Sequence, residues 1–302
     1  MSKIILLAGG SGLVGARLSA LLRSAGYSVR LLTRTPKAPH EFYWNPLKGE
    51  LDPAALDLVD GIINLAGAGI AEKPWTKERK QEIIESRVLA ATVLADALKA
   101  GNIRPEMYIS ASAIGYYGNS GSQRMYESDK PVDDSFMADC CTQWESAAEM
   151  IAHLGIRTVK FRIGIVLDTR GGALAEIIKP LRFGLGVYFA DGSAWWSWIH
   201  IDDLCRMMIW ALENPLEGIY NAVAPNPETG KSIVTQTAKA MNRPSIRLPA
   251  PEFALKLVLG EMSAVVLNSN LVSSEKIQGT GFEFQFPGLN DALADLFKRN
   301  QG

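Results

Sequence analysis

Three glycines near the amino terminus are spaced so that a backbone loop could approach an anion closely. Gly9, Gly12 and Gly15 follow a short apolar run and lie around the start of a helical pattern at Leu13 and Val14. Glycines leave room for a tight turn, because no Cβ atom stands between the backbone and a ligand. The first amides of the helix and the positive end of its dipole would face that ligand. The spacing therefore predicts a loop that binds the pyrophosphate of a dinucleotide.

The end of the next apolar run favours one dinucleotide over another. Sites for NAD usually place Asp or Glu here, where a carboxylate accepts a hydrogen bond from the ribose 2′-hydroxyl. In this chain the run ends at Thr33 and Arg34, with Lys37 close behind. A guanidinium at Arg34 could pair with a 2′-phosphate, so we expect NADP(H). The alternative is that Arg34 is a solvated loop residue.

Short apolar runs alternate with helical patterns through the first half of the chain. Strands are expected over 4–8, 29–32, 61–65, 107–110 and 157–165. Helices are expected over 13–25, 76–100 and 136–154, the second of them capped by Thr76. Such alternation is typical of a parallel sheet with helices on both faces. We therefore predict an α/β fold with a Rossmann-type doubly wound parallel sheet, in which the loops after the strands share one edge.

The second half of the chain is less regular and predicts a second unit. Residues 195–201 suggest an extended segment that leads into a helix at Asp202 or Asp203, followed by a strand at 218–222. Later residues are mainly helical, with a final strand at 282–284 and a helix over 290–299. We assign 1–168 to an NADP-binding Rossmann domain, with 197–225 returning to it. A smaller, mostly helical C-terminal subdomain takes 169–196 and 226–302.

The composition excludes several classes of function. The 302 residues carry a formal net charge of −1, which gives no electrostatic reason to expect nucleic acid or an anionic membrane surface. The apolar runs are too short for a membrane-spanning helix. Cys140, Cys141 and Cys205 fit neither a disulfide framework nor a zinc site. We therefore expect a cytoplasmic protein that acts on a small molecule and holds no metal.

Further motifs lie where strands of the predicted sheet end. They are Asn64-Leu65-Ala66-Gly67, Ile109-Ser110-Ala111-Ser112 and Tyr116-Tyr117-Gly118. Together with the glycine loop, these motifs resemble the extended short-chain dehydrogenases of the NAD-dependent epimerase/dehydratase superfamily. The resemblance implies that Asn64, Ala66, Gly67 and Ser110 lie at the cofactor.

A closer resemblance covers nearly the whole chain. It is to a divergent subgroup called epimerase family proteins, of the YfcH type, which has its own C-terminal domain. The matching motifs are Lys73-Pro74-Trp75-Thr76, Ser86-Arg87, Trp144-Glu145, Arg162-Ile163-Gly164-Ile165-Val166-Leu167, Gly171-Gly172, Trp198-Ile199-His200-Ile201-Asp202-Asp203 and Gly260-Glu261. The resemblance puts Arg87 near the cofactor edge, where it could pair with a phosphate or with a carboxylate of the fold.

The catalytic pair of the wider superfamily is missing at the expected place. The resemblance implies a Tyr-x-x-x-Lys pair, whose tyrosine exchanges a proton with the substrate while hydride moves to or from the nicotinamide. Aligned on Glu145, this chain has Met137 and Cys141 at the two positions. Methionine has no exchangeable proton, and a cysteine on a helix face is usually a small buried hydrophobe.

Four other residues are candidates for the missing chemistry. Ser112 keeps the superfamily's serine position, Tyr116 and Tyr117 lie in the turn that ends at Gly118, and His200 could act as a general acid near neutral pH. Each also has a structural interpretation, with Tyr116 and Tyr117 as a packed aromatic turn and His200 as a hydrogen-bonded histidine. Trp195, Trp196 and Trp198 could equally form a ligand wall or part of the core.

Two functions are compatible with these patterns. The first is an NADP(H)-dependent oxidoreductase or nucleotide-sugar-epimerase-like enzyme that acts on an unidentified small polar substrate. The second is a non-catalytic NADP(H)-binding regulatory or scaffold protein, as the missing pair suggests. The resemblance also allows a homodimer that pairs through the helices expected at 76–100 and 136–154.

Overall fold

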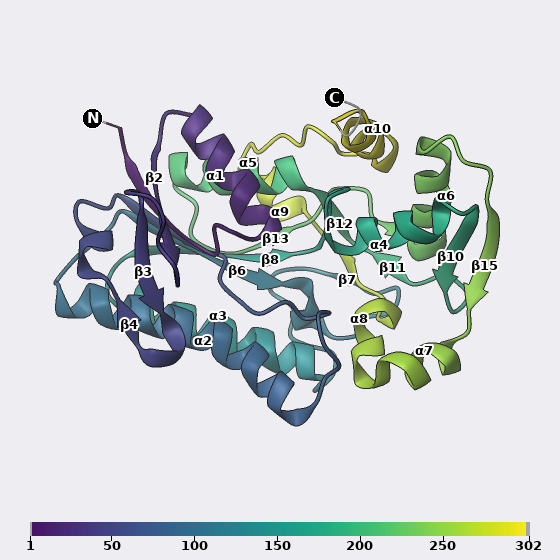
Figure 1. The fold of residues 1–302 in the computed structure, drawn as a ribbon, viewed down its shortest axis with the longest axis horizontal. Coiled ribbons are helices and arrows are strands. Elements are labelled where there is room, and N and C mark those ends of the chain that lie inside the picture. Colours follow the sequence, from purple (N-terminus) through teal and green to yellow (C-terminus); the bar gives the residue numbers. More distant parts are fainter. Residues whose placement is uncertain (1, 300–302) are drawn as a thin grey trace.

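An eight-stranded sheet forms the centre of the computed structural model, which describes residues 2–299 (Figure 1). Its strands lie in the order β13-β8-β6-β5-β1-β2-β3-β4, and every neighbouring pair is parallel except β3 and β4. These strands are β1 (Ile4–Ala8), β2 (Ser28–Thr33), β3 (Glu41–Asn45), β4 (Glu50–Leu51), β5 (Gly61–Asn64), β6 (Met107–Ala113), β8 (Arg157–Ile163) and β13 (Gly218–Ala222). The expected α/β fold with a doubly wound parallel sheet is confirmed.

The order of the strands reverses between β1 and β5. The chain passes from β1 to β2 on one side of it and later returns to β5 on the other side. Ile5 lies opposite Val29 of β2 and Gly61 of β5, so β1 has a parallel neighbour on each side. Connections that leave such a reversal diverge and open a crevice at the carboxyl edge of the strands, where α/β proteins bind ligands.

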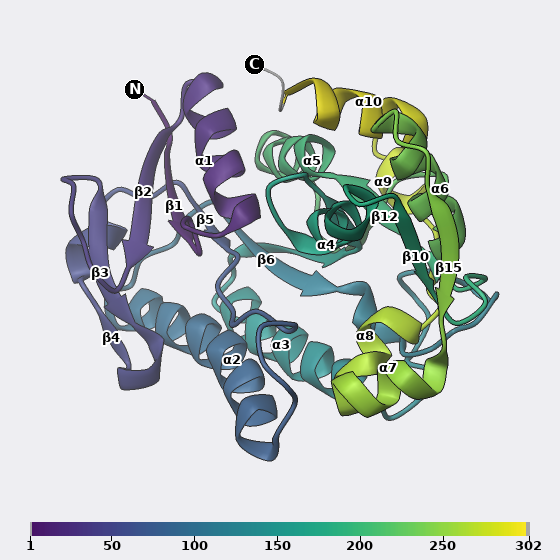
Figure 2. The same cartoon turned by 45° about the vertical axis from the view of Figure 1, so that its right-hand side comes forward.

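Helices cover both faces of the sheet (Figures 1 and 2). α1 packs with α5 on one face, and α2 packs with α3 on the other. The helices are α1 (Leu13–Ser24), α2 (Lys77–Ala100), α3 (Phe136–Ala152), α4 (Gly172–Leu181), α5 (Ile201–Glu213), α6 (Gly230–Ala240), α7 (Glu252–Leu259), α8 (Ala264–Leu267), α9 (Glu275–Gln278) and α10 (Leu289–Arg299). The buried core is divided in the same way: Leu18 and Leu22 join the cluster on one face, and Leu94 and Leu98 join that on the other.

Short polar side chains start the two longest helices. The Thr76 hydroxyl accepts a hydrogen bond from the amide of Arg79 at 3.2 Å, as expected for the cap of α2. The Ser135 hydroxyl accepts one from the amide of Ala138 at 3.4 Å and begins α3. These caps fix where both helices start beside the sheet.

The strand expected over 157–165 is divided at Gly164. A Cβ atom there would overlap the carbonyl oxygen of Ser197, so the backbone of another segment takes its place. The amide of Ile165 donates to that same oxygen at 2.9 Å. The chain thus leaves β8 and forms β9 (Ile165–Leu167), which pairs in parallel with β12 (Trp198–His200).

The later elements form a smaller region, on the right of Figure 1, while β13 returns to the main sheet beside β8. Its strands are β10 (Leu185–Phe189), β11 (Trp195–Trp196), β14 (Glu228–Thr229) and β15 (Ile246–Ala250), and β16 (Leu271–Val272) pairs with β7 (Arg124–Met125). The expected strand at 282–284 is wrong. The amides of Gln285 and Phe286, which follow it, each donate at 2.8 Å to the Asp203 carboxylate, which holds this segment against α5 instead of a neighbouring strand. The proposed domain boundaries stay predictions.

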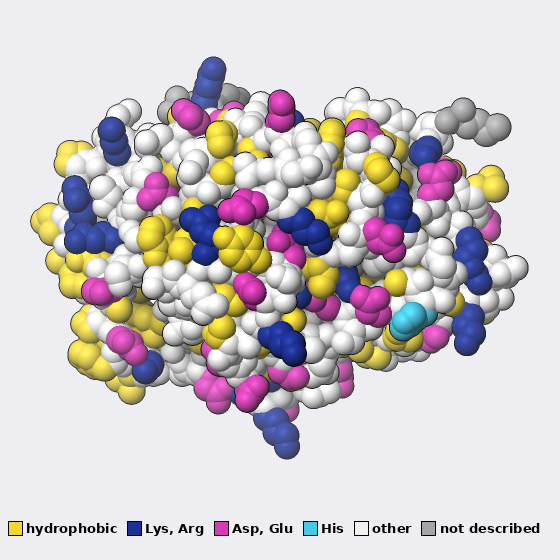
Figure 3. Space-filling model, turned by 180° about the vertical axis from the view of Figure 1, so that it is seen from behind, with side chains coloured by type: hydrophobic (Ala, Val, Ile, Leu, Met, Phe, Trp, Pro, Cys, Tyr) yellow, Lys and Arg dark blue, Asp and Glu magenta, His cyan; other side chains and the backbone are white. Residues whose placement is uncertain are grey.

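Acidic and basic side chains are mixed on the face of the molecule opposite to that seen in Figure 1 (Figure 3). Among the helices described between residues 2 and 299, none has the length and apolar character needed to cross a bilayer.

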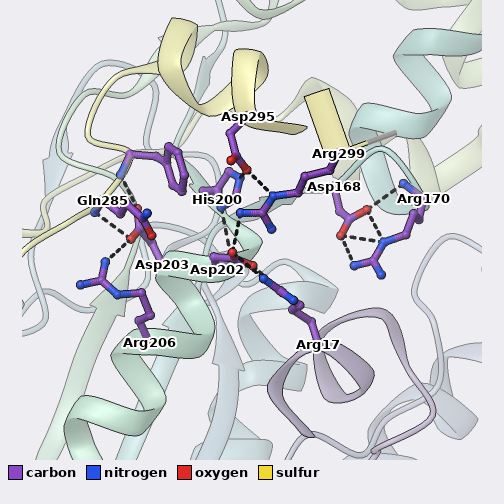
Figure 4. Close-up of polar contacts among 11 residues, drawn as sticks. Arg17, Asp168, Arg170, His200, Asp202, Asp203, Arg206, Gln285, Asp295 and Arg299 are labelled. Carbon is purple, nitrogen blue, oxygen red and sulfur yellow. Dashed lines mark hydrogen bonds and ion pairs between the residues drawn. The ribbon is translucent and has the colours of Figure 1, made fainter. Parts of the chain in front are cut away.

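The first and last helices meet at Asp202, near the start of α5 (Figure 4). Arg17 of α1 donates to the two carboxylate oxygens at 2.7 and 2.8 Å, and Arg299 of α10 lies 2.7 Å from Oδ2. Burial opposes the charge of this carboxyl, but hydrogen bonds from the two arginines outweigh burial and hold its pKa below the usual range. Asp202 therefore joins three helices as an ionised group.

We predict that Asp202→Asn destabilises the protein at neutral pH and flattens its response to acid. A carboxyl with a depressed pKa contributes stability above its unfolded pKa of about 3.9, and this is lost as the pH falls toward the folded value. The free energy of unfolding in urea should drop by about 3 kcal/mol at neutral pH. Below about pH 5 it should then decline less steeply than in the wild type. The control is Asp96→Asn, on the exposed face of α2, and equal slopes for all three proteins would refute the assignment.

Candidate functional site

The glycine loop between β1 and α1 makes a tight turn at the carboxyl edge of the sheet. Gly9 has a φ of 78°, a left-handed conformation that side-chain-bearing residues rarely adopt. The amide of Gly12 donates to the carbonyl oxygen of Gly9 at 3.1 Å. A Cβ atom on Gly15 would overlap that same oxygen. Helix α1 can therefore begin this close to the turn only with glycine at position 15.

The start of α1 fits an anionic group. Gly12 precedes the helix, no side chain caps the helix amides, and the first turn carries no acidic residue. Leu13 and Val14 pack their side chains against the core, and the first amides of this 12-residue helix point along its axis toward its amino end. Uncapped amides at a helix start bind phosphate groups through hydrogen bonds and the helix dipole. The loop thus fits the pyrophosphate of a dinucleotide.

Arg34 lies at the same edge, where β2 ends. The Thr33 hydroxyl accepts a hydrogen bond from the amide of Thr35 at 3.3 Å, which turns the chain as it leaves the strand. The side chains of Arg34 and Lys37 are exposed. An exposed guanidinium beside the crevice fits a 2′-phosphate, and no acidic residue ends β2.

The loop after β5 is held by a buried asparagine. Asn64 donates through Nδ2 to the Tyr108 hydroxyl at 3.0 Å and accepts from the amide of Ala66 through Oδ1 at 3.1 Å. These bonds fix the path of the chain into Gly67. On the neighbouring strand β6, the hydroxyl of the buried Ser110 donates to the carbonyl oxygen of Ala111 at 3.0 Å. The residues expected at the cofactor therefore lie after or near the ends of four adjacent strands, and their contacts with it stay predictions.

Arg87 comes to this edge from α2. Its Cζ atom is 3.1 Å from the position that a Cβ on Gly67 would occupy. The sequence left open whether this arginine pairs with a carboxylate of the fold. No carboxylate of the described residues offsets its charge.

Ser112 and Tyr117 belong to one buried polar network. The Ser112 hydroxyl donates to Oε1 of Glu145 at 2.8 Å. Arg162 binds both oxygens of Glu145, through Nε at 2.8 Å and through Nη2 at 2.9 Å. Its Nη1 donates to the Tyr117 hydroxyl at 3.1 Å, and that hydroxyl donates to Oδ1 of Asn221 at 2.7 Å. The network links β6, α3, β8, β13 and the turn at Ile114–Tyr117.

The environment of this network fixes the charges of its members. Burial disfavours the guanidinium of Arg162, but the hydrogen bonds and charge of Glu145 raise its pKa above the ordinary value. Burial raises the pKa of Tyr117 to about 12, against the smaller opposite effect of Arg162. Both hydroxyls, of Ser112 and Tyr117, are engaged inside the fold. The structure brings the two candidates together, in contacts typical of a structural role, and a catalytic role for either stays a prediction.

The positions of the missing catalytic pair lie beside the same turn. The Cβ position of Gly115 is 3.2 Å from Cε of Met137 and 3.9 Å from Sγ of Cys141. Burial raises the pKa of the Cys141 thiol to about 12, so this group is a neutral thiol at physiological pH. Neither residue can replace the proton exchange of tyrosine or the charge of lysine.

His200 lies apart from Ser112 and Tyr117, in the polar cluster of α1, α5 and α10 (Figure 4). Its Nδ1 accepts a hydrogen bond from the amide of Asp202 at 3.1 Å. The residue that caps α5 is therefore His200, and not Asp202 or Asp203. Nε2 is 3.3 Å from Oδ2 of Asp295, and the ring packs on Phe286 with centroids 4.0 Å apart. Burial lowers the pKa of His200, which favours a neutral ring. These contacts are typical of a structural histidine, and its catalytic role stays a prediction.

A cleft of about 700 Å³ lies in the smaller region. Its lining includes Asn119, Tyr188, Trp195, Trp196, Lys256 and Asn268. Asn119 follows the turn at Ile114–Tyr117, and its Oδ1 accepts from the amide of Ser269 at 2.9 Å, which ties this turn to the wall of the cleft. Trp195 and Trp196 line the cleft, whereas Trp198 is buried in the core.

Some of these residues had a signal in the sequence and others had none. Arg162 lies between Phe161 and Ile163, and a charged residue between apolar residues of a strand is a signal of a buried ion pair, whereas Glu145 has polar residues nearby. Asn119 and Asn268 carry no such signal, because the two loops meet only through tertiary folding. Within residues 2–299 no group of acidic, histidine and cysteine side chains could hold a metal ion.

Comparison with known proteins gives matches over almost the whole chain. Residues 5–222 match the model of the NAD dependent epimerase/dehydratase family, and residues 250–296 match a domain of unknown function, DUF1731. An epimerase family protein of Staphylococcus aureus (strain N315) is 35% identical over 300 residues, which cover 98% of this chain and 99% of the relative.

Solved structures agree with these matches. The human epimerase family protein SDR39U1, crystallised with NADPH, superimposes with a TM-score of 0.90 at 30% identity, over 98% of this chain and 99% of the human one. UDP-glucose 4-epimerase of Thermus thermophilus with NAD has a TM-score of 0.78 at 19% identity, over 98% of this chain and 99% of that one, which shows the fold alone. The resemblance inferred from the motifs is confirmed, and so is a nicotinamide cofactor for the family. The NADPH of the human protein agrees with the expected NADP(H).

We predict that Glu145→Ala destabilises the protein by about 3–5 kcal/mol, because it leaves the Arg162 guanidinium buried without its counter-ion. The measurement is the free energy of unfolding in urea. The matched control is Glu176→Ala, which removes an exposed partner of Lys179 and should cost about 0–1 kcal/mol. Similar losses for the two variants would contradict a central role for the Glu145–Arg162 pair.

Proposed function

Because this chain belongs to the NAD dependent epimerase/dehydratase family, we propose that it is an NADP(H)-dependent oxidoreductase or epimerase-like enzyme that acts on a small polar molecule. The observation that supports this most is the convergence of the uncapped start of α1, Arg34 and the loop after β5 at one edge of the sheet. A bound nicotinamide would supply hydride transfer. The chain itself binds and orients the cofactor and admits the substrate.

The proposed preference for NADP(H) rests on Arg34. No carboxylate ends β2 to accept from a ribose 2′-hydroxyl, and the exposed guanidinium can pair with a 2′-phosphate in two parallel hydrogen bonds. NADPH in the human relative supports the same choice.

We predict that Arg34→Ala weakens the binding of NADPH by about tenfold or more and leaves that of NADH nearly unchanged, since only NADPH carries the 2′-phosphate. Fluorescence titration of the two reduced cofactors gives both dissociation constants. Arg23→Ala, at the exposed far end of α1, is the control and should change neither. Equal affinities of the wild type for NADPH and NADH would rule out the proposed preference.

The proposed substrate site is the 700 Å³ cleft. Its lining combines aromatic side chains with amide and hydroxyl groups, a mixture typical of sites for small polar ligands. The loop with Asn119 leads to it from the end of β6, the strand that carries Ser110 and Ser112.

Tyr116 is the better placed of the two adjacent tyrosines for exchanging a proton with a substrate. The ring of Tyr116 is half-buried, with Cζ of Arg162 3.4 Å from its centroid. Its hydroxyl has no hydrogen-bond partner among the described residues, whereas that of Tyr117 is bound to Arg162 and Asn221.

We predict that Tyr116→Phe lowers turnover by about a hundredfold without a loss of stability. The adjacent Tyr117→Phe should instead cost about 1–2 kcal/mol of stability, because Oδ1 of Asn221 and Nη1 of Arg162 each lose one buried hydrogen bond. The readout is NADPH absorbance over a panel of aldehydes, ketones and nucleotide sugars, together with urea unfolding. Full turnover in Tyr116→Phe would remove this tyrosine from the mechanism.

A second function is favoured by Met137 and Cys141, which stand where the superfamily has its proton-exchanging pair. A protein that binds NADP(H) as a regulator or scaffold needs neither group. Wild-type protein that binds NADPH tightly but turns over no member of the panel would support this second function.

The proposal includes a cytoplasmic setting, because Cys140, Cys141 and Cys205 are free thiols. It names a small molecule as the partner rather than nucleic acid or a membrane, in keeping with the net charge of −1. A homodimer through α2 and α3, which lie side by side on one face, remains part of the proposal.

A further inference from the structure

Arg87 is a buried cation without a counter-ion among residues 2–299. It is 9% exposed, and its Nη1 donates to the carbonyl oxygen of Ile83 at 2.9 Å. The guanidinium lies over the Trp144 ring, 4.9 Å from the centroid. Burial lowers the pKa of Arg87, and no carboxylate of the described residues opposes that effect.

Other buried arginines of this fold are paired. Arg162 binds Glu145, and Arg79, two turns before Arg87 on the same helix, lies 3.2 Å from Glu72 and 2.7 Å from Glu82. An unpaired charge in the interior is costly unless some other group offsets it. The contrast indicates that Arg87 serves a bound molecule rather than the fold.

The order of the strands indicates which part of a bound dinucleotide would lie near Arg87. The pyrophosphate belongs at the start of α1, after β1, and the 2′-phosphate at Arg34, after β2. The remaining half, the nicotinamide nucleoside, must then extend to the other side of β1, over β5 and β6. Arg87 contacts Gly67 in the loop after β5, and α3 with Trp144 packs against β6. Arg87 therefore lies on the nicotinamide side.

We infer that Arg87 places an unpaired positive charge beside the nicotinamide half of bound NADP(H) and so favours the reduced cofactor over the oxidised one. The oxidised ring carries a positive charge and the reduced ring carries none, while the two cofactors share their phosphates and nearly their shape. A fixed cation nearby thus repels only the oxidised form. The inference rests on the proposed binding of NADP(H).

The test compares the dissociation constants of NADP+ and NADPH by calorimetry, for the wild type, Arg87→Gln, Arg87→Met and Arg87→Lys. The wild type should bind NADPH more tightly. A unit charge acting within one site changes the ratio of the NADP+ to the NADPH dissociation constant by roughly tenfold. The two neutral variants should therefore lower this ratio by about that factor, and Arg87→Lys should leave it as in the wild type. A purely structural disturbance would weaken both cofactors equally and leave the ratio unchanged.

The matched control is Arg157→Gln. Arg157 also donates to backbone carbonyl oxygens, those of Ala211, Asn214 and Leu216, but at the amino end of β8, on the opposite edge of the sheet. Its substitution should leave the ratio as it is. If Arg87→Gln does not fold, Arg87→Met against Arg87→Lys decides, since both retain an aliphatic stem over Trp144.

Three outcomes separate the inference from the proposed function. An unchanged ratio in the neutral variants overturns the inference and leaves the cofactor assignment standing. A wild type that binds NADP+ at least as tightly as NADPH overturns the inference without any variant. A wild type that binds neither cofactor overturns the proposed function itself.

Discussion

The ion pair between Arg162 and Glu145 is the contact on which the arrangement of the site depends. It joins β8 to helix α3, which covers one face of the sheet, with two hydrogen bonds of 2.8 and 2.9 Å. Ser112 and Tyr117 attach β6 and the following turn to the same pair, and Asn221 attaches β13. Since buried charges are stable only when paired and hydrogen-bonded, any shift of one element leaves a charge exposed to an apolar interior. The pair thereby fixes the turn from which the loop to the cleft departs.

Two buried arginines on that face, Arg162 of β8 and Arg87 of α2, have opposite surroundings. Arg162 has a carboxylate and two further acceptors. Arg87 has a carbonyl oxygen, the Ser86 hydroxyl at 3.5 Å and the indole ring of Trp144, which are all uncharged. The charge of Arg162, which holds several elements together, is thus neutralised within the fold. The charge of Arg87, at the edge proposed to bind the cofactor, is not. Functional groups that are unsatisfied in the protein alone are a common mark of a binding site.

The sequence predicted those features that depend on local pattern. The glycine spacing, the apolar runs and the caps depend on near neighbours, so β1, α1, α2 and the edge with Arg34 follow from the sequence. The division at Gly164 does not, because the Ser197 carbonyl that requires it comes from a distant segment. For the same reason Phe282–Phe284, with strand-like composition, is no strand: its following amides are bound by Asp203. The engagement of Ser112 and Tyr117 within a network also depends on partners that only the tertiary fold brings together.

The ion pairs of Asp202 with Arg17 and Arg299 constrain the order in which contacts of this chain can form. Arg17 and Arg299, which both bind the carboxylate, lie near opposite ends of the sequence. A ribosome therefore releases α1 long before α10, and the face of the sheet that carries α1 and α5 stays partly uncovered in the meantime. Contacts between such distant residues also slow folding, because the loop between them must close before they form. The ion pairs at Asp202 are thus complete only after the last described helix has been synthesised.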